Sequence, residues 1–152
     1  MVRLYLVQHG EAKKKEEDPQ RPLTEKGRLN TEKIAGFLAR AGIKVDRIVH
    51  SGKLRAKQTA EILAEKLGAS RIEEDPDLEP LAPPEKWTKR LEALNEDTML
   101  VGHLPHLSLL ASLLLTGDKN IQPVKFTYSG VVCLEKTGDG WKLVWMITPE
   151  LL

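Results

Sequence analysis

The chain has 152 residues, of which 41% are hydrophobic and 30% charged, and its formal net charge is +1. This length suits one domain, residues 1–152, around one core. The near-neutral charge argues against an electrostatic nucleic-acid binder, and no apolar run reaches the roughly 20 residues that cross a bilayer.

The first third of the chain predicts a strand, a loop and a helix. Val2–Val7 is a short apolar segment, typical of a buried strand. Lys13–Gln20 mixes opposite charges without an apolar anchor, which indicates a solvated loop. Thr24 is suited to cap a helix over about Glu25–Ala41. The apolar residues of this helix largely follow helical spacing: Leu29, Ile34, Phe37, Leu38 and Ala41.

The middle of the chain continues the alternation of strands and helices. Val45–Val49 predicts a second strand, and a second helix follows over about Lys53–Leu67. The residues predicted to face inward on that helix are Leu54, Thr59, Ile62, Leu63 and Leu67. Arg71–Glu73 is a candidate short strand, the proline-rich Asp75–Pro84 is a loop, and a third helix extends to about Leu94.

The last third predicts one more strand and helix, and then a hairpin. Thr98–Val101 is an apolar strand, and Pro105 opens a helix that reaches about Leu115. Gly130–Glu135 and Trp141–Ile147 are joined by a glycine-bearing turn, which is a hairpin signal. This order predicts an α/β fold with three layers, αβα, and a mostly parallel sheet that ends in an antiparallel C-terminal hairpin.

Three of the predicted strands end in polar residues. The first ends in Gln8-His9-Gly10, the second in His50-Ser51 with Arg55 one turn further on, and the third in Gly102-His103. Parallel strands present these ends at one edge of the sheet, where ligands bind in open α/β folds. Alone, His9 could be a hydrogen-bonded structural histidine, and Arg55 an ordinary surface charge. Their convergence with His103 favours a functional pocket.

This predicted pocket suits an oxyanion better than a metal ion. A metal site usually has three or four neutral or anionic ligands, and an arginine beside it would repel the cation. The planar guanidinium of Arg55 matches phosphate. Helix starts near Lys53 and Pro105 would add backbone N–H groups. We therefore expect a phosphate site with no metal and no cofactor.

The chain resembles the histidine phosphatase superfamily in five segments, which occur in this order: LVQHGEA, RPLTEKG, HSGKLRAKQTAE, DLEPL and VGHLP. Within that superfamily it is most similar to the compact SixA-type phosphohistidine phosphatases. The resemblance spans nearly the whole chain and implies a phosphoglycerate mutase-like fold. It also implies a phosphatase that acts through a phosphohistidine intermediate, with a phosphorylated protein as substrate.

The resemblance implies roles for individual residues. His9 matches the nucleophile that becomes transiently phosphorylated. Arg55 and His103 match the arginine and second histidine of the phosphate pocket, and Arg21 matches an arginine that also faces the phosphate. These roles agree with the chemistry, because a neutral imidazole can split hydrolysis into two displacements without a metal.

Two positions leave alternatives open. Gln8 stands where the family normally has arginine, so the pocket loses one full positive charge. That loss predicts weaker phosphate binding, slower turnover, or a module that binds phosphate without turnover. Glu79 is the candidate general acid by position, but it could equally cap the following turn. Phosphohistidine releases an imidazole with a pKa of about 6.5, which needs little help from an acid.

The expected function is therefore hydrolysis of phosphohistidine in a protein, and the first alternative is a small-molecule phosphomonoesterase. The expected partner is a phosphorylated protein or a small phosphorylated molecule, with no nucleic acid and no membrane. Cys133 is the only cysteine and is expected to be a small buried hydrophobe. With no signal-peptide pattern at the start, we expect a cytoplasmic location. The sequence leaves the oligomeric state open.

Overall fold

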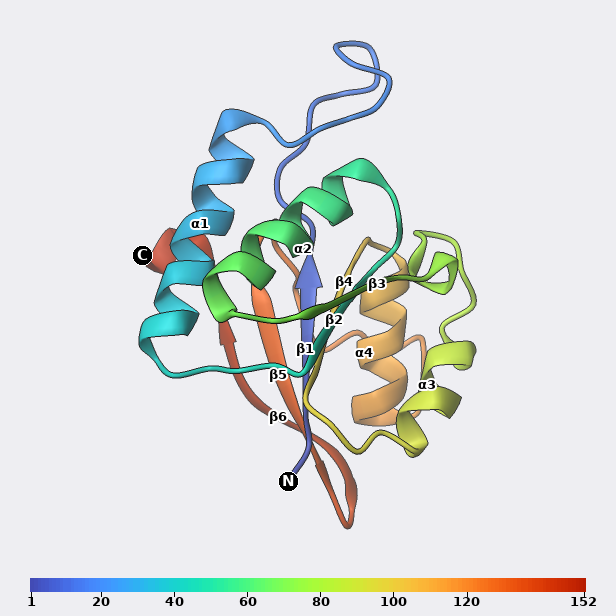
Figure 1. The fold of residues 1–152 in the computed structure, drawn as a ribbon. Helices are drawn as coiled ribbons and strands as arrows, with labels where there is room; N and C mark the ends of the chain where they lie inside the picture. The colour runs from blue at the N-terminus through green and yellow to red at the C-terminus, as the bar shows by residue number, and fades with distance from the viewer.

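A six-stranded sheet forms the middle layer of the computed structural model, which describes residues 1–152 (Figure 1). The strands are β1 (Arg3–Gln8), β2 (Arg47–His50), β3 (Arg71–Glu74), β4 (Thr98–Gly102), β5 (Val131–Thr137) and β6 (Gly140–Ile147). Their order across the sheet is β3-β2-β4-β1-β5-β6. Strands β3, β2, β4 and β1 pair in parallel, whereas β5 is antiparallel to both β1 and β6. The prediction of a mostly parallel sheet with a C-terminal hairpin is confirmed.

Helices cover both faces of this sheet (Figure 1). One face packs against α1 (Glu25–Arg40) and α2 (Leu54–Leu67), and the other packs against α3 (Glu85–Glu92) and α4 (His106–Thr116). Short 3₁₀ turns follow β3 and β6, at Pro76–Leu78 (η1) and Pro149–Leu151 (η2). The three-layer prediction is therefore confirmed.

Alternating side chains along β1 contribute to both apolar clusters. Tyr5 and Val7 lie in the cluster under α1 and α2, and Leu4 and Leu6 lie in the cluster under α3 and α4. All four are at most 2% exposed, and full burial of such a side chain contributes about 1.5–3 kcal/mol. Cys133, on the neighbouring β5, is buried as expected.

The buried faces of α1 and α2 differ from the sequence prediction. On α1, Leu29 and Phe37 are 46% and 36% exposed, although they follow the apolar spacing. On α2, Leu54, Ile62 and Leu67 are only partly buried. The buried positions include small residues instead: Gly27, Thr31 and Ala35 on α1, and Ala56, Ala60 and Ala64 on α2. The reason is close packing, since a Cβ on Gly27 would lie 2.1 Å from the Glu11 carbonyl oxygen.

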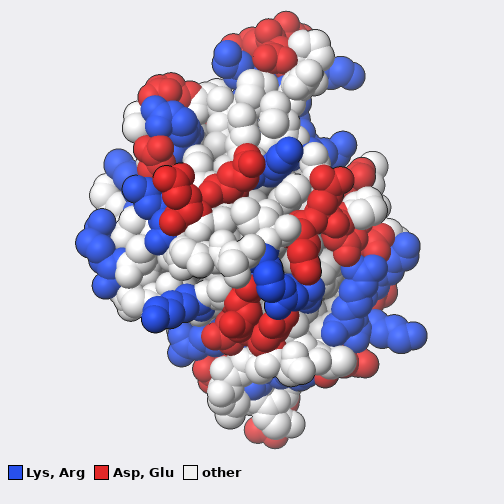
Figure 2. Space-filling view, viewed as in Figure 1, with Lys and Arg blue, Asp and Glu red and all other residues white.

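Charged side chains of both signs are interspersed on the face shown in Figure 2. Many are paired: Arg28 contacts Glu25 and Glu32 along α1, and Arg71 contacts Glu96 across the sheet edge. Exposed pairs of this kind contribute only about 0–1 kcal/mol each, so the fold depends mainly on its two apolar clusters. None of the helices combines the length and the apolar character that a membrane span requires.

Candidate active site

The carboxyl ends of β1, β4 and β2 bring three polar side chains to one edge of the sheet. His9 follows β1, and its backbone N–H donates to the Gly102 carbonyl of β4 at 3.0 Å. The rings of His9 and His103 lie 5.0 Å apart between centroids. The His103 Nε2 is 2.6 Å from the hydroxyl of Ser51, which follows β2. The structure therefore brings His9 and His103 together where the parallel strands end.

His9 is held in one tautomer. Its Nδ1 lies 2.7 Å from the Gly10 carbonyl oxygen, which can only accept, so Nδ1 carries the proton and Nε2 keeps its lone pair. Burial lowers the pKa of His9 to about 4; the hydrogen bond to Gly10 opposes this, while the charges of Arg55 and Arg21 add to it. The imidazole is thus neutral at neutral pH, which is its nucleophilic form.

The tight turn after His9 is tied to α2. The Gly10 N–H donates to the Thr59 hydroxyl at 2.9 Å, and that hydroxyl donates to the Arg55 carbonyl at 2.8 Å. A side chain at Gly10 would force a neighbour to shift, because its Cβ would lie 2.8 Å from the Thr31 hydroxyl. Thr59 therefore joins the turn that carries His9 to the helical turn that carries Arg55.

Arg55 projects from the first turn of α2 with an incomplete set of partners. Its Nε is buried and makes no hydrogen bond within the protein. Burial lowers the pKa of Arg55, and the charge of Arg21 lowers it further, yet a guanidinium stays protonated in proteins. A bound anion would offset the repulsion between these two neighbouring cations and would accept a hydrogen bond from the free Nε–H of Arg55.

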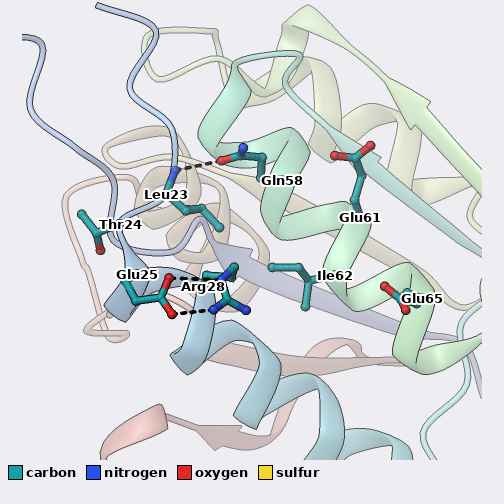
Figure 3. A pocket seen from close by; sticks show the side chains of 8 residues that line it. All are labelled: Leu23, Thr24, Glu25, Arg28, Gln58, Glu61, Ile62 and Glu65. Atoms are coloured by element: carbon teal, nitrogen blue, oxygen red, sulfur yellow. Dashed lines mark hydrogen bonds and ion pairs between the residues drawn. The ribbon is translucent and has the colours of Figure 1, made fainter. Parts of the chain in front are cut away.

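Arg21 lies on the loop between β1 and α1, and this loop is anchored to α2. The Leu23 N–H donates to the Gln58 side-chain oxygen at 2.8 Å (Figure 3). Arg21 itself has a left-handed backbone, with φ of 51°, and its Nε donates to the Lys13 carbonyl at 3.0 Å. The charge of Arg21 lowers the pKa of both His9 and Arg55. Arg21 is therefore close enough to interact with the other residues of the predicted phosphate site.

The cavity beside this loop does not contain the predicted site residues. It has a volume of about 290 Å³ and lies between α1 and α2 (Figure 3). Three carboxylates line it, those of Glu25, Glu61 and Glu65, and only Glu25 is paired there, with Arg28. Such a lining repels phosphate, so the chemistry of this cavity differs from that of the His9 pocket.

His103 presents a second buried donor. The Ser51 hydroxyl accepts from the Lys53 N–H and is free to donate its own proton to His103 Nε2. That arrangement favours the proton of the neutral ring on Nδ1, which is buried without a partner. Burial lowers the pKa of His103 to about 3, and the charges of His9 and Arg55 act in the same direction. His103 is therefore a neutral donor in the pocket.

Gln8 is buried at the end of β1. It is 7% exposed, and its Oε1 has no hydrogen-bond partner. The alternation along the strand assigns Gln8 to the face of Leu4 and Leu6, opposite the face of His9.

Glu79 lies at the margin of the pocket. It follows η1, its side chain is 45% exposed, and its carboxylate pairs with Lys53 at 3.9 Å. Lys53 is close enough for its charge to lower the pKa of His103. Glu79 makes no hydrogen bond to either histidine. Its only interaction with this group of residues is the ion pair with Lys53.

Tyr128 belongs to the site but was missed in the sequence. Its ring lies 5.6 Å from that of His9 between centroids and is 48% exposed. The residue occupies an irregular segment before β5, and the only local signal is the turn-forming Ser129-Gly130 that follows it. In contrast, His50 follows the sequence pattern but serves the local turn, because its Nδ1 accepts from the Gly52 N–H at 3.0 Å.

The free polar atoms of the pocket indicate what it can bind. Buried polar atoms are nearly always paired in folded proteins. Here Arg55 Nε and His103 Nδ1 are buried donors without acceptors, and they come from elements that also contact the His9 turn. An oxyanion held beside His9 Nε2 would satisfy such donors and would place an electrophilic centre against a nucleophile.

Comparison with known proteins is consistent with this chemistry. Residues 4–82 match the family model described as the histidine phosphatase superfamily (branch 1). The phosphohistidine phosphatase SixA of Escherichia coli K12 is 28% identical over 156 residues, which cover 97% of this chain and 94% of that protein. An uncharacterized protein of Picosynechococcus is 36% identical over 128 residues, covering 77% of this chain and 75% of its own.

Solved structures extend the comparison to the fold. The protein histidine phosphatase SixA complexed with tungstate superposes with a TM-score of 0.86 at 25% identity, over 99% of each chain. The alpha-ribazole phosphatase of Shigella flexneri superposes with a TM-score of 0.80 at 16% identity, over 97% of each chain. At that lower identity the likeness shows the fold alone.

Proposed function

The chain belongs to the histidine phosphatase superfamily and is similar to SixA at 25–28% identity, and from this premise we propose that it hydrolyses phosphohistidine in a protein through a phosphorylated His9. One observation carries the proposal. A buried, neutral His9 has its Nδ1 occupied and its Nε2 free, and the charge of Arg55, whose Nε is buried and unpaired, acts on its ring. This combination provides a nucleophile and a site for the phosphoryl oxygens.

In the first step, the lone pair of His9 Nε2 forms a bond to phosphorus while the P–N bond of the substrate breaks. The bonding electrons go to the leaving nitrogen. When the other ring nitrogen of the substrate is protonated, the ring departs as neutral imidazole and needs no proton from the enzyme. Arg55, Arg21 and the Nδ1–H of His103 stabilise the charge on the phosphoryl oxygens.

In the second step, a water molecule attacks the phosphorus of phosphorylated His9. The bond between phosphorus and Nε2 breaks, its electrons return to Nε2, and inorganic phosphate leaves with the water oxygen. One proton of the water passes to solvent. His9 returns as the neutral ring with its Nδ1 proton still donated to Gly10, so the same tautomer serves both steps.

The choice of phosphohistidine rests on the leaving group and on the similarity to SixA. Glu79 is half-exposed and paired with Lys53, which suits a site that needs no strong general acid. A small-molecule phosphomonoesterase would need Glu79 in that role, because an alkoxide leaves only with a proton. The uncharged Gln8 favours a third possibility, a module that binds phosphate without turnover.

Trapping phosphate on His9 tests the proposal. After brief incubation with phosphoramidate or acetyl phosphate, the protein should carry acid-labile, base-stable phosphate. His9→Ala should lose both the label and the turnover, and a chelator should leave the labelling unchanged. His106→Met is a matched control, since it removes a histidine outside the proposed chemistry. Label that persists in His9→Ala would assign the nucleophile elsewhere, and a parent protein that binds phosphate but never labels would be a binding module.

A further inference from the structure

Two aromatic rings flank His9, and they differ in exposure. His103, whose ring lies 5.0 Å away between centroids, is 1% exposed, whereas Tyr128, whose ring lies 5.6 Å away, is 48% exposed. His9 itself is only 6% exposed. Of these two neighbours, Tyr128 therefore lies on the more open side of His9.

Tyr128 is held in place by the residue that follows it. The Ser129 N–H donates to the Gln8 carbonyl at 3.0 Å, so the segment is bonded to the strand that ends at His9. The Ser129 hydroxyl lies 2.8 Å from the Thr31 hydroxyl of α1, and the Ser129 backbone is left-handed, with φ of 63°. These bonds fix the backbone next to Tyr128, so the segment that carries the half-exposed ring is organised before a ligand binds.

The surroundings of Tyr128 connect the phosphate pocket to open space. Tyr128 also lines a groove of about 440 Å³, whose charged residues are Glu11, Lys26, Lys33 and Glu150. The ring therefore lies beside His9 and also borders a space that can accept the rest of a substrate.

We propose that Tyr128 is the specificity-determining wall of the site, on which the leaving ring of the substrate stacks. The inference rests on the proposed function and narrows its substrate class to phosphoryl groups carried by a planar ring. In-line attack from about 3–3.5 Å, with one P–N bond added, puts the leaving nitrogen roughly 5 Å from His9 Nε2. Aromatic pairs interact over centroid distances of roughly 4.5–7 Å, so a ring beside His9 can contact the leaving ring as well.

The test compares two donors that differ in their leaving groups. Phosphoimidazole releases a ring, and acetyl phosphate releases acetate, which has no ring and needs no proton. Tyr128→Leu should lower kcat/KM for phosphoimidazole roughly 3- to 10-fold, because an apolar chain remains but the aromatic face is lost. The same variant should stay within about 2-fold of the parent protein on acetyl phosphate. Tyr128→Phe, the matched control, should resemble the parent on both donors.

Each other outcome overturns the inference. Equal losses on both donors would make Tyr128 a structural residue, since a displaced His9 or Arg55 would slow any phosphoryl transfer. A Tyr128→Phe variant as slow as Tyr128→Leu would assign the effect to the hydroxyl. The proposed function fails separately, if His9 of the parent protein takes no label from either donor. A parent that takes label from acetyl phosphate but not from phosphoimidazole would exclude the ring-bearing substrate class itself.

Discussion

The stability of the fold should depend on the protonation of His106, which is fully buried and has no hydrogen-bond partner for either ring nitrogen. It is the first residue of α4 and lies in the layer that covers the β1 side chains Leu4 and Leu6. Burial lowers the pKa of His106 from 6.5 to about 4, and the charge of Asp77 offsets this only in part. Protonation of this ring is therefore coupled to unfolding.

The sign and size of the coupling follow from the two pKa values. Above pH 6.5 the ring is neutral in both states and the coupling is absent. As the pH falls below 6.5, the unfolded chain takes up a proton that the folded protein does not, so stability falls until His106 titrates in the folded state near pH 4. At pH 5 this single ring lowers the free energy of unfolding by about 2 kcal/mol relative to neutral pH.

Replacement by methionine isolates the effect. Methionine is apolar and adaptable and binds no proton, so His106→Met should lose less stability on acidification than the parent protein. We expect the difference in unfolding free energy between the two proteins, from urea titrations at pH 7.5 and pH 5, to shift by about 2 kcal/mol in favour of the variant. His9 is present in both proteins, so its own coupling cancels, and the charge of His106 is only the smallest of the five causes that lower the pKa of His103. A difference that is the same at both pH values would refute the reasoning.

Three further predictions concern the site itself. Glu79→Gln should change the hydrolysis of phosphohistidine by less than about 3-fold, and a loss of about 10²-fold or more in that assay would make Glu79 a general acid. Gln8→Arg should bind vanadate roughly fivefold more tightly, about 1 kcal/mol, because it restores a charged donor; titrations that show no gain would mean that the pocket is built around glutamine. Gly10→Ala should lower the free energy of unfolding by about 1–3 kcal/mol in urea titrations, since its Cβ would lie 2.8 Å from the Thr31 hydroxyl; an unchanged midpoint would contradict this.

Several helix ends could be predicted because local chemistry sets them. Thr24 caps α1 as expected, with its hydroxyl accepting from the Gly27 N–H at 3.0 Å. Gly68 and Gly117 end α2 and α4 in the left-handed conformation that glycine adopts without strain. Signals of this kind lie within one helical turn of the boundary that they specify, so the sequence displays them directly.

The buried face of α1 and the position of Tyr128 could not be predicted in this way. Both depend on contacts between distant segments: Glu11 approaches Gly27 closely, and Ser129 bonds to Gln8 across more than a hundred residues of chain. Periodicity describes where apolar residues lie on a helix, but it does not reveal which face a neighbouring backbone will approach. In contrast, the convergence of His9 and His103 could be predicted, because the carboxyl ends of parallel strands lie at the same edge of a sheet.

The loss of charge at position 8 is compatible with the proposed chemistry for a physical reason. Arg55 and Arg21 already repel each other, and their charges lower the pKa of His9 as well. A third guanidinium would strengthen the binding of substrate phosphate and product phosphate alike, and uniform binding of that kind does not raise kcat. The P–N bond of phosphohistidine is labile and its leaving group needs no acid, so this substrate demands less transition-state stabilisation than an alkyl phosphate. Gln8 is therefore expected to lower the affinity for phosphate rather than kcat, and a substrate with a good leaving group, which the marginal position of Glu79 also favours, tolerates that change.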